Sequence, residues 1–494
     1  MQMIRFGEIC IGLTYLFDSS QSFAQTSLVS LQLETGFTAS ANRSTPFWLR
    51  ANQYGIVPLE TPVATFRFLA AKSYAPKDTA RPRASRFGWG FGVYPVVNAG
   101  ITSQVLLPEA YGKIKFGALE LWVGRRRTLI GLGDSVLSSG FLIGSGNALP
   151  IPKVQLATLG YVPLKFLGSF VAINAGYAHG WFTNTYIKQS YLHQKYVYWR
   201  FGKPKATIKV HMGMNHQVQW GGHADYLLGS PLAVNGRLPS AFKYYGNIVL
   251  ATLPIDLQNA DYTSFDGSYR IGNHVGGHDL GIEIATRRET ILLYYQHPFE
   301  DVSGLLFQNL PDGLMGLSWQ RHPGKASGTF RLDRMVLEFL NTSDQSGSTF
   351  WRAQSRFQGA DNYFNHSQYR EGWSYRGRAI GTPFIAPRPE FQSDISRSAT
   401  AFFPDNRVRM WYAGATGQFT RLFWTARLAY SQHYGTYANP FDRARHQVSF
   451  LLSTEGSLTK SGKTRLRTAL ALDRGQVYPE TVGASVSLLH TIHH

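Results

Sequence analysis

The stretch ATIKVHMGMN, residues 206–215, alternates between apolar and polar side chains along its whole length. Successive side chains of a β-strand point to opposite faces, so this stretch would form a strand with one apolar and one polar face. The apolar face carries Ala206, Ile208, Val210, Met212 and Met214, and the other carries Thr207, Lys209, His211, Gly213 and Asn215. An apolar face toward lipid and a polar face toward a lumen are typical of a transmembrane barrel strand.

The same alternation recurs along the chain, for example in residues 424–433, 466–473 and 482–488. The runs approach the roughly 9–11 residues that a tilted transmembrane strand requires, and clusters of Gly, Pro, Asn and Asp separate them. Many runs begin or end in an aromatic residue, and we expect these residues to form girdles at the membrane interfaces. They include Trp122, Trp199, Trp220, Tyr294, Tyr295, Phe339, Trp424 and Tyr430. The pattern predicts an all-β fold, a large transmembrane antiparallel β-barrel that forms one domain over residues 25–494.

Hydrophobic residues make up 44% of the 494 residues, yet after the N-terminus no segment approaches the roughly 20 consecutive apolar residues of a membrane helix. Apolar and polar residues are therefore evenly mixed. This composition fits a membrane barrel and also fits a large soluble β-protein, so it does not by itself separate the two.

The N-terminus has the pattern of an export signal. Arg5 supplies a positive start, residues 9–17 form a short apolar core, and Ser22-Phe23-Ala24 is a small-x-small cleavage site. We expect residues 1–24 to be a cleaved signal peptide, which predicts that the mature chain reaches the bacterial outer membrane. The alternative is a buried N-terminal strand or helix. Cys10 is the only cysteine, so the mature chain would contain no disulfide.

One segment, residues 129–157, departs from the strand pattern. It is rich in Gly, Ser and Pro, but it also carries Leu and Ile. Long irregular segments inside compact domains are usually functional. We expect this segment to plug the barrel, and a long surface loop is the alternative.

The formal net charge of +19 predicts an anionic partner. For an exported chain the candidates are an acidic polysaccharide and the phosphates of lipopolysaccharide in the outer-membrane lipid. Nucleic acid does not fit, because the sequence carries no recognised nucleic-acid-binding motif.

Signals of catalysis are weak. The sequence has no GxSxG elbow and no HExxH zinc helix. His274, His278 and Asp279 have a spacing that could suit a metal on a helix, but the neighbouring glycines favour a polar turn or a strand end. We therefore expect no enzyme activity, no metal and no cofactor.

Aromatic faces beside arginines, amides and carboxylates suit sugars better, since the planar guanidinium pairs with acidic groups. The richest such stretch is DNYFNHSQYREGWSYRGR, residues 361–378; two others are residues 46–54 and Arg125-Arg126-Arg127. The polysaccharide-binding candidates are Trp48, Arg50, Arg125, Arg126, Arg127, Asp361, Tyr363, Tyr369, Arg370, Trp373, Tyr375, Arg376 and Arg378. The alternative for each is a solvated loop or lumen-wall residue.

Several of these stretches resemble the capsule assembly Wzi family of Gram-negative outer membranes. The matching phrases are TPFWLRANQYG (45–55), GFLIGSGNALPIPK (140–153), YAHGWF (177–182), HPFEDVSG (297–304), NLPDGLMGL (309–317), EFLNTSD (338–344) and residues 361–384. The likeness spans about residues 35–390 and weakens after that. The chain resembles the branch of the family with long, variable loops.

The resemblance implies a barrel of about eighteen strands whose periplasmic end is closed by a small plug or helical segment. It also implies a lectin-like protein that retains capsular polysaccharide at the cell surface during capsule assembly, and it supplies no catalytic residues. We expect a monomer that holds an anionic polymer through many weak, salt-sensitive contacts. The rivals are a passive channel or porin-type transporter with an open lumen, and an outer-membrane serine hydrolase.

Overall fold

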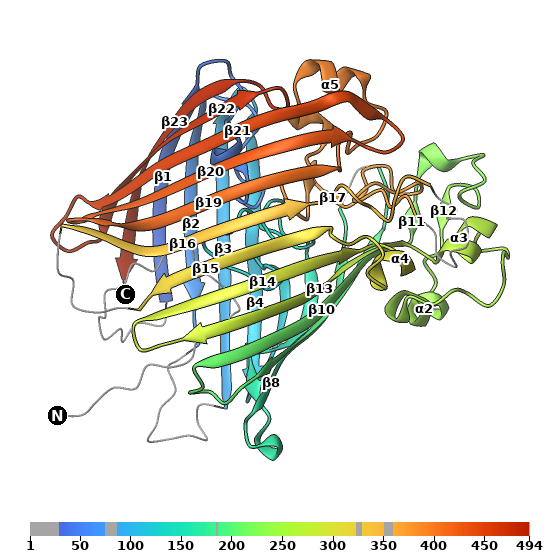
Figure 1. Ribbon diagram of the computed structural model, residues 1–494, viewed down its shortest axis with the longest axis horizontal. Helices are drawn as coiled ribbons and strands as arrows, with labels where there is room; N and C mark the ends of the chain where they lie inside the picture. Colours follow the sequence, from blue (N-terminus) through green and yellow to red (C-terminus); the bar gives the residue numbers. More distant parts are fainter. Residues whose placement is uncertain (1–28, 75–85, 184–185, 323–328, 350–358, 494) are drawn as a thin grey trace.

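The structure is a computed structural model, and it describes residues 29–74, 86–183, 186–322, 329–349 and 359–493. The expected signal peptide lies outside these residues. Within them the chain forms one large antiparallel sheet that closes on itself as a barrel (Figure 1). The closing contact joins the two ends of the sheet, because the first strand pairs with the second on one side and with the last on the other.

The strands of the barrel follow one another in chain order. They are β1 (Val29–Ser40), β2 (Val63–Lys72), β3 (Phe87–Gly100), β4 (Gln104–Phe116), β5 (Leu119–Arg125), β6 (Lys153–Thr158), β7 (Val162–Pro163), β8 (Val171–Trp181), β9 (Tyr191–Phe201), β10 (Ile208–Trp220), β13 (Asn273–Ala285), β14 (Glu289–Phe299), β15 (Gly313–Arg321), β16 (Phe330–Asn341), β19 (Val408–Phe419), β20 (Leu422–Gly435), β21 (Pro440–Ser457), β22 (Thr464–Gly475) and β23 (Thr481–His493). The short β6 and β7 both pair with β8 and so form one interrupted strand. The described residues therefore form an eighteen-stranded barrel, as predicted.

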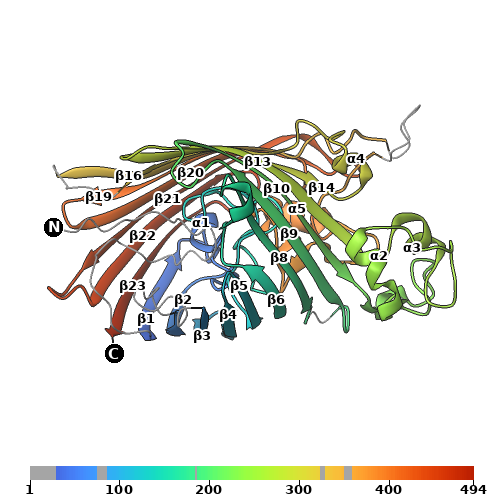
Figure 2. The ribbon, with the colours of Figure 1, turned by 90° about the horizontal axis from the view of Figure 1, so that it is seen from below.

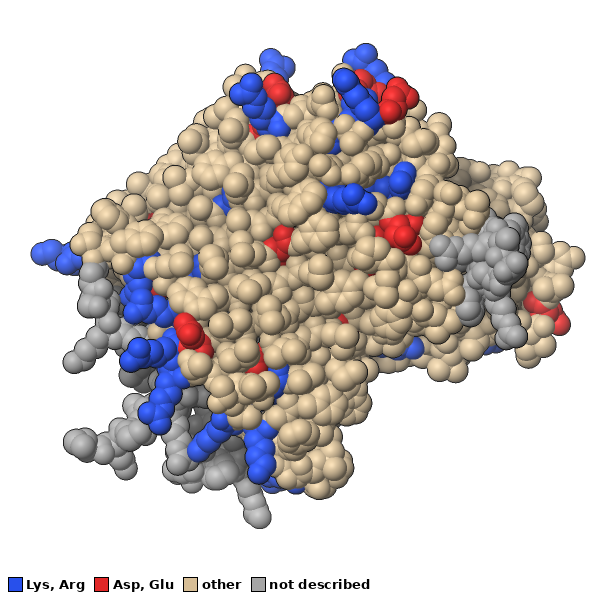
Figure 3. All heavy atoms as spheres, viewed as in Figure 1, with Lys and Arg blue, Asp and Glu red and all other residues tan. Residues whose placement is uncertain are grey.

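The alternation in residues 206–215 places side chains as expected. Ile208 and Met212 are 59% and 46% exposed on the outer face, whereas Lys209 points inward and pairs with Glu283 at 2.6 Å. Met212 lies opposite Leu280 of β13, which is also exposed. Figure 3 shows the result on one side of the barrel: a broad outer face with few charged side chains, and more Lys and Arg side chains toward its ends. Such an apolar belt is what lipid requires.

The two ends of the barrel differ in the length of their connections. The end that carries the start of β1 and the end of β23 has short turns, such as residues 117–118, 286–288 and 420–421. The opposite end has long connections, above all residues 221–272 and 342–407. In outer-membrane barrels the short turns face the periplasm and the long loops face outward, so we call the second end the mouth.

The described α-helices are short, and all five lie in connections at the mouth (Figure 1). They are α1 (Phe47–Arg50), α2 (Tyr245–Leu250), α3 (Ser264–Tyr269), α4 (Val302–Leu305) and α5 (Ser393–Ser398); the 3-10 turns are η1 (Lys165–Leu167), η2 (Asp225–Leu227), η3 (Phe242–Tyr244) and η4 (Arg388–Glu390). No helix in the described ranges is both long and apolar enough to cross a membrane. The described α-helices thus lie at the opposite end from the periplasmic closure expected from the resemblance, because the long mouth connections carry them, whereas η1 lies in the short turn between β7 and β8 at the periplasmic end.

The hydrophobic core lies inside the barrel. Its largest cluster joins residues of α1, the segment 137–149 and the loop residues 363–403 to inward side chains of the wall, among them Val336, Met410 and Ala471. Two short hairpins belong to the mouth loops: β11 (Gly222–His223) with β12 (Arg237–Leu238), and β17 (Ser374–Tyr375) with β18 (Arg378–Ala379). Seen from below in Figure 2, α1 and the chain after β5 lie within the curve of the strands.

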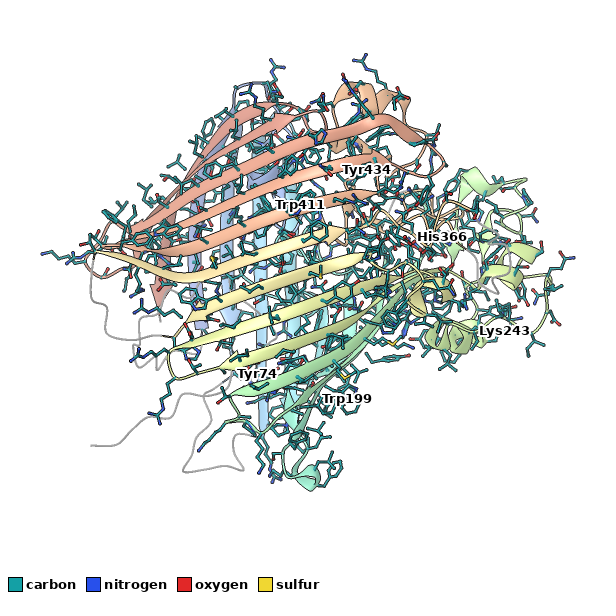
Figure 4. The ribbon with its side chains drawn as sticks, in the orientation of Figure 1. Tyr74, Trp199, Lys243, His366, Trp411 and Tyr434 are labelled. Atoms are coloured by element: carbon teal, nitrogen blue, oxygen red, sulfur yellow. The ribbon has the colours of Figure 1, made fainter. Side chains whose placement is uncertain are left out.

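The aromatic girdle is only partly where the sequence suggested. Trp199 and Tyr430 are outward and exposed, and Figure 4 shows Trp199 on β9 and Trp411 on β19 along the barrel wall. Trp122 and Tyr294 instead point into the lumen, where they are 2% and 4% exposed. Trp122 stands between Leu121 and Val123, which take the outward positions. These two aromatic residues therefore belong to the core and not to an interface.

Candidate functional site

Residues 129–152 of the predicted plug segment lie inside the barrel, whereas residues 153–157 belong to wall strand β6, so the predicted segment extends too far at its end. The part inside the barrel begins after β5 and ends where the chain returns to the wall as β6. Within it, the backbones of Ile130 and Gly144 pair in an isolated bridge. Leu132 and Leu137 are almost fully buried between the segment and the wall. Their close approach depends on glycines of the wall, since a Cβ on Gly281 would stand 2.6 Å from Leu132 and one on Gly414 would stand 2.9 Å from Leu137.

Polar side chains of the wall satisfy the backbone of this plug. Asp279 of β13 accepts a hydrogen bond from the Leu132 amide at 2.9 Å, and Gln296 of β14 accepts one from Leu142 at 2.9 Å. Glu338 of β16 accepts the Ser139 amide at 2.6 Å. A buried irregular backbone needs such partners, because it has no strand ladder to pair with. The plug is thus bonded to the wall at many points.

A second anchor holds the loop between β1 and β2 inside the barrel. The Phe47 amide donates to Asp473 at 2.6 Å, and the Trp48 indole donates to the Ser449 carbonyl at 3.1 Å. Arg50 pairs with Glu390 from the loop after β18. Trp48 and Arg50, both predicted to contact sugar, are 3% and 4% exposed, so the structure places them in the core.

The arginines before the plug are mostly used within the protein. Arg126 pairs with Glu120 at 2.5 Å, and Arg127 pairs with Glu109 at 2.9 Å. Arg125 is half-buried, and its guanidinium donates to the Tyr375 hydroxyl at 3.3 Å.

The stretch 361–378 is also largely buried. Tyr363, Tyr369, Trp373 and Tyr375 are at most 2% exposed. Arg378 is 7% exposed and pairs with Glu390 at 2.9 Å; burial together with the nearby charge of Arg50 lowers the pKa of Arg378 to about 9. These aromatic rings therefore hold the loop in the mouth, and their faces are covered by protein.

Acidic side chains in the same region are buried as well. The Asp361 carboxylate accepts the Ser346 hydroxyl at 2.9 Å, and burial, with the charge of Asp301 adding to it, raises the pKa of Asp361 well above its ordinary range. Asp312 accepts the Tyr363 hydroxyl at 2.9 Å and the Gln345 amide at 2.8 Å, and burial raises its pKa to about 6. No group of three or more His, Cys, Asp or Glu in the described part of the chain is arranged to hold a metal.

Arg370 and Arg376 are the predicted sugar-contact residues that the structure leaves exposed. The Arg376 guanidinium donates to the Thr183 hydroxyl at 3.1 Å, and Thr183 in turn shares a 2.6 Å hydrogen bond with Tyr375. The Arg370 guanidinium lies 5.8 Å from the ring of Tyr226. We name Arg125, Thr183, Tyr226, Arg370 and Arg376 the mouth cluster.

Other cations are exposed or half-exposed in the described mouth connections, so the mouth carries much of the positive charge. They are Arg43, Lys188, Arg237, Arg388, Arg397 and Arg407, and Arg443 and Arg445 lie near the mouth end of β21. Aromatic rings support some of them: the Arg407 guanidinium lies 4.0 Å from the ring centre of Tyr437. Guanidinium groups beside aromatic rings can bind acidic sugars through both charge and stacking. Figure 4 shows His366 and Tyr434 at this end of the barrel.

One cavity between the plug and the wall has a volume of about 50 Å³. Tyr54, Arg126, Lys153, Gln194 and Gln217 are among its lining residues.

Sequence reasoning missed two kinds of residue. Thr183 and Tyr226 belong to the mouth cluster only because loops far apart in the chain meet there. The carboxylates of Asp279 and Glu338 hold the plug, and the signal was available: each is an acidic residue at an inward position of an alternating strand. The stretch around His274 and His278 forms the start of β13, so the strand end was predicted correctly.

Comparisons with known proteins agree with this architecture. The family model described as capsule assembly protein Wzi matches residues 72–416. Among solved structures, the chain is similar to Wzi of Escherichia coli, an outer membrane protein involved in group 1 capsule assembly that is described as a carbohydrate binding β-barrel. The identity is 16%, the TM-score is 0.59, and the match covers 94% of this chain and 85% of that one.

Two further solved structures show weaker likeness. OccAB2 of Acinetobacter baumannii is 8% identical with a TM-score of 0.44, covering 94% of this chain and 98% of its own. OprD of Pseudomonas aeruginosa is 7% identical with a TM-score of 0.43, covering 95% of this chain and 96% of its own. No curated protein sequence matches the chain significantly.

Proposed function

Because the chain belongs to the capsule assembly protein Wzi family, we propose that it binds an anionic surface polysaccharide at the mouth of its outer-membrane barrel and retains it at the cell surface without transforming it. The name of the family places the protein in capsule assembly. The finer role, lectin-like retention, rests on the chemistry of the mouth.

One observation carries the proposal: the lumen is filled by a bonded plug, while arginines that are not consumed by buried ion pairs lie at the mouth. Arg370 and Arg376 stand on one loop, beside Tyr226 and Thr183. Each exposed contact with an anionic group contributes little alone. A polymer presents the same group many times, so weak contacts combine into stable retention.

A passive channel is the rival that the geometry disfavours. Its lumen would have to be open, whereas here the wall residues Asp279, Gln296 and Glu338 hold the plug in place.

The binding test uses the purified full-length protein and acidic capsular polysaccharide from the same cells. The double variant Arg370→Ser and Arg376→Ser removes two exposed charges without touching the core. We expect a dissociation constant raised about twofold to thirtyfold, since each of the two exposed charged contacts contributes about 0.2–1 kcal/mol. Arg421→Ser removes the same charge from the exposed turn between β19 and β20 at the other end and is expected to bind as the unchanged protein does.

Deletion of the gene tests retention separately from binding. Cells that lack the protein should release polymer into the medium while they continue to make it. Loss of total polysaccharide would instead indicate a role in synthesis, and unchanged cell-attached polysaccharide would contradict retention.

A further inference from the structure

Part of the outer wall near the mouth is polar and yet buried. His193 of β9, His216 of β10 and His274 of β13 are 0%, 3% and 8% exposed. They face outward, because they share strand parity with Trp199, Met212 and Leu280, which are exposed in the apolar belt. Side chains on the outside of a barrel are buried only where something covers them.

The cover is the connection between β10 and β13. We name residues 241–271, which include η3, α2 and α3, the outer lobe. The Tyr245 ring of α2 lies 5.8 Å from the His193 ring and 5.7 Å from the Trp220 ring, and its hydroxyl is 3.0 Å from that of Tyr177 on β8. The Lys195 ammonium of β9 donates to the Val249 carbonyl. The outer lobe therefore lies against the outside of the barrel and not over its lumen.

A buried apolar contact and a polar link fix the outer lobe in this position. Ile248 is fully buried in one cluster with Val218 and Trp220 of the wall. Asp266 of α3 accepts a hydrogen bond from the Gln368 amide of the mouth loop at 3.1 Å. The lobe is thus an ordered part of the wall, with one side against the barrel.

The other side of the outer lobe exposes five large apolar side chains: Phe242 (83%), Leu250 (70%), Leu253 (52%), Ile255 (102%) and Leu257 (69%). The lobe also exposes Asp256 and the ion pair between Lys243 and Asp261. So many large apolar side chains close together on a surface mark an interaction site. Figure 1 places the lobe, with α2 and α3, beside the ends of β10 and β13.

We propose that the outer lobe lies in the outer leaflet of the membrane, with these five side chains among the acyl chains of the lipid. The patch is continuous with the lipid-facing belt: Phe242 stacks on Tyr245 at 5.7 Å, and Tyr245 contacts Tyr177, which is 42% exposed on β8. Amphipathic segments that lie in a membrane interface bury one apolar face in this way. The lobe also removes the wall histidines from contact with lipid.

A neighbouring loop repeats the arrangement. Phe307, in the connection after α4, stacks on the outward rings of His278 at 5.0 Å and His297 at 4.6 Å. Leu306, Phe307 and Leu310 are 51%, 43% and 51% exposed. Two separate mouth connections therefore cover outward histidines and present apolar side chains, as lipid contact would require.

The test measures the surroundings of single labelled positions in the full chain, reconstituted into phosphatidylcholine vesicles. Cys10 is replaced (Cys10→Ser), and an environment-sensitive fluorophore is attached to Ile255→Cys or Phe242→Cys. Both positions are exposed; the label at 242 replaces the stack of Phe242 on Tyr245, whereas the label at 255 leaves that stack in place. We expect quenching by brominated acyl chains and loss of quenching by iodide in the water. Leu280→Cys in the belt and Ser367→Cys, exposed in the mouth loop, are the lipid and water references.

Each outcome decides the proposal. Labels at 255 and 242 that behave as the label at 280 support it. Labels that respond to iodide as the label at 367 does overturn it, because the lobe then stands in water. Labels shielded from both quenchers also overturn it, since protein, such as a second copy of the chain, then covers the lobe. None of these results depends on polysaccharide binding.

Discussion

At the scale of residues, buried charges decide which arginines can act on a ligand. Arg50 and Arg378 both pair with the single carboxylate of Glu390, and all three side chains are less than 10% exposed. This group joins the loop before β2 to the loop after β18. Arginines used in this way hold the mouth together and are not available to a polymer.

Removing the shared carboxylate should be costly. Glu390→Ala leaves two buried guanidinium groups without their partner, and such a loss typically destabilises a protein by about 3–5 kcal/mol. We expect the variant to unfold at markedly lower temperature or urea concentration, measured by the change in gel mobility that accompanies barrel unfolding in detergent. Glu60→Ala, at an exposed site in the same loop as Arg50, should unfold with the unchanged protein.

The buried aspartates predict a dependence on pH. The pKa of Asp361 is raised by burial and by the charge of Asp301, and that of Asp312 is raised to about 6. A carboxyl whose folded pKa is raised binds more protons in the folded state, so its stabilising contribution is full below pH 4 and is lost as the pH rises through the folded value. We therefore expect these groups to lower the unfolding free energy between about pH 4 and pH 8.

The variant Asp361→Asn tests this pH dependence. It keeps the shape of the side chain without an ionisable proton, so the unfolding midpoint should vary less with pH. Asp394→Asn, on the exposed α5, should retain the full variation. A midpoint that falls equally with pH in all three proteins would contradict the assignment to Asp361.

At the scale of elements, the plug is the segment that separates a binding barrel from a channel. Residues 131–143 lie between Ile130 and Gly144, which form an isolated bridge. The Ile130 amide nitrogen is 3.0 Å from the Gly144 carbonyl oxygen, so the two ends of the segment are close together. The segment can therefore be replaced by a short Gly-rich turn while the wall strands keep their ends.

We expect the shortened protein to conduct ions in a planar lipid bilayer and the unchanged protein to remain closed. The same turn inserted between Ser461 and Gly462, in the exposed turn after β21, is the matched control and should not conduct. Stable conductance by the unchanged protein would contradict a sealed lumen and would favour the channel alternative.

Two strands also show when the local sequence predicts which face of a strand points outward. The alternation in residues 206–215, of which 208–215 belong to β10, was predicted with the correct face outward, because only one of its two faces is apolar. In LELWVGR, residues 119–125, one face carries Leu119, Leu121 and Val123, and the other carries the large aromatic Trp122 between Glu120 and Gly124. Which of Leu121, Trp122 and Val123 meets lipid is then decided by the partners inside: Trp122 packs beside Arg126 and Lys153 in the lumen.

At the scale of the whole molecule, the chain carries a net charge of +19, and exposed arginines and lysines lie in turns and loops at both ends of the barrel. Exposed charges are screened by salt, and the Debye length falls to about 3 Å at 1 M ionic strength. We expect the affinity for an acidic polysaccharide to fall steadily with added salt, measured by titration of the purified protein at several ionic strengths. A neutral polysaccharide is the control. Affinity for the acidic polymer that is indifferent to salt would count against the charge mechanism.

The candidate site was predicted less well than the fold. Thirteen residues were chosen because arginines and aromatic rings are clustered in the sequence, but most of them, such as Trp373 and Tyr375, are buried. The chemistry that suits a sugar also suits a protein core in which rings stack and guanidinium groups pair with carboxylates. Composition cannot distinguish these uses, since they differ only in exposure.

The sequence by itself determined the all-β architecture and the irregular plug segment, because strand alternation and its interruption are local properties of the chain. The strand number came from resemblance to the family and was confirmed by the sheet. Only the tertiary structure decided which arginines remain free at the mouth, which carboxylates hold the plug, and that residues 241–271 fold outside the wall. Those outcomes depend on contacts between segments far apart in the chain, because these contacts decide which side chains are buried and which remain exposed.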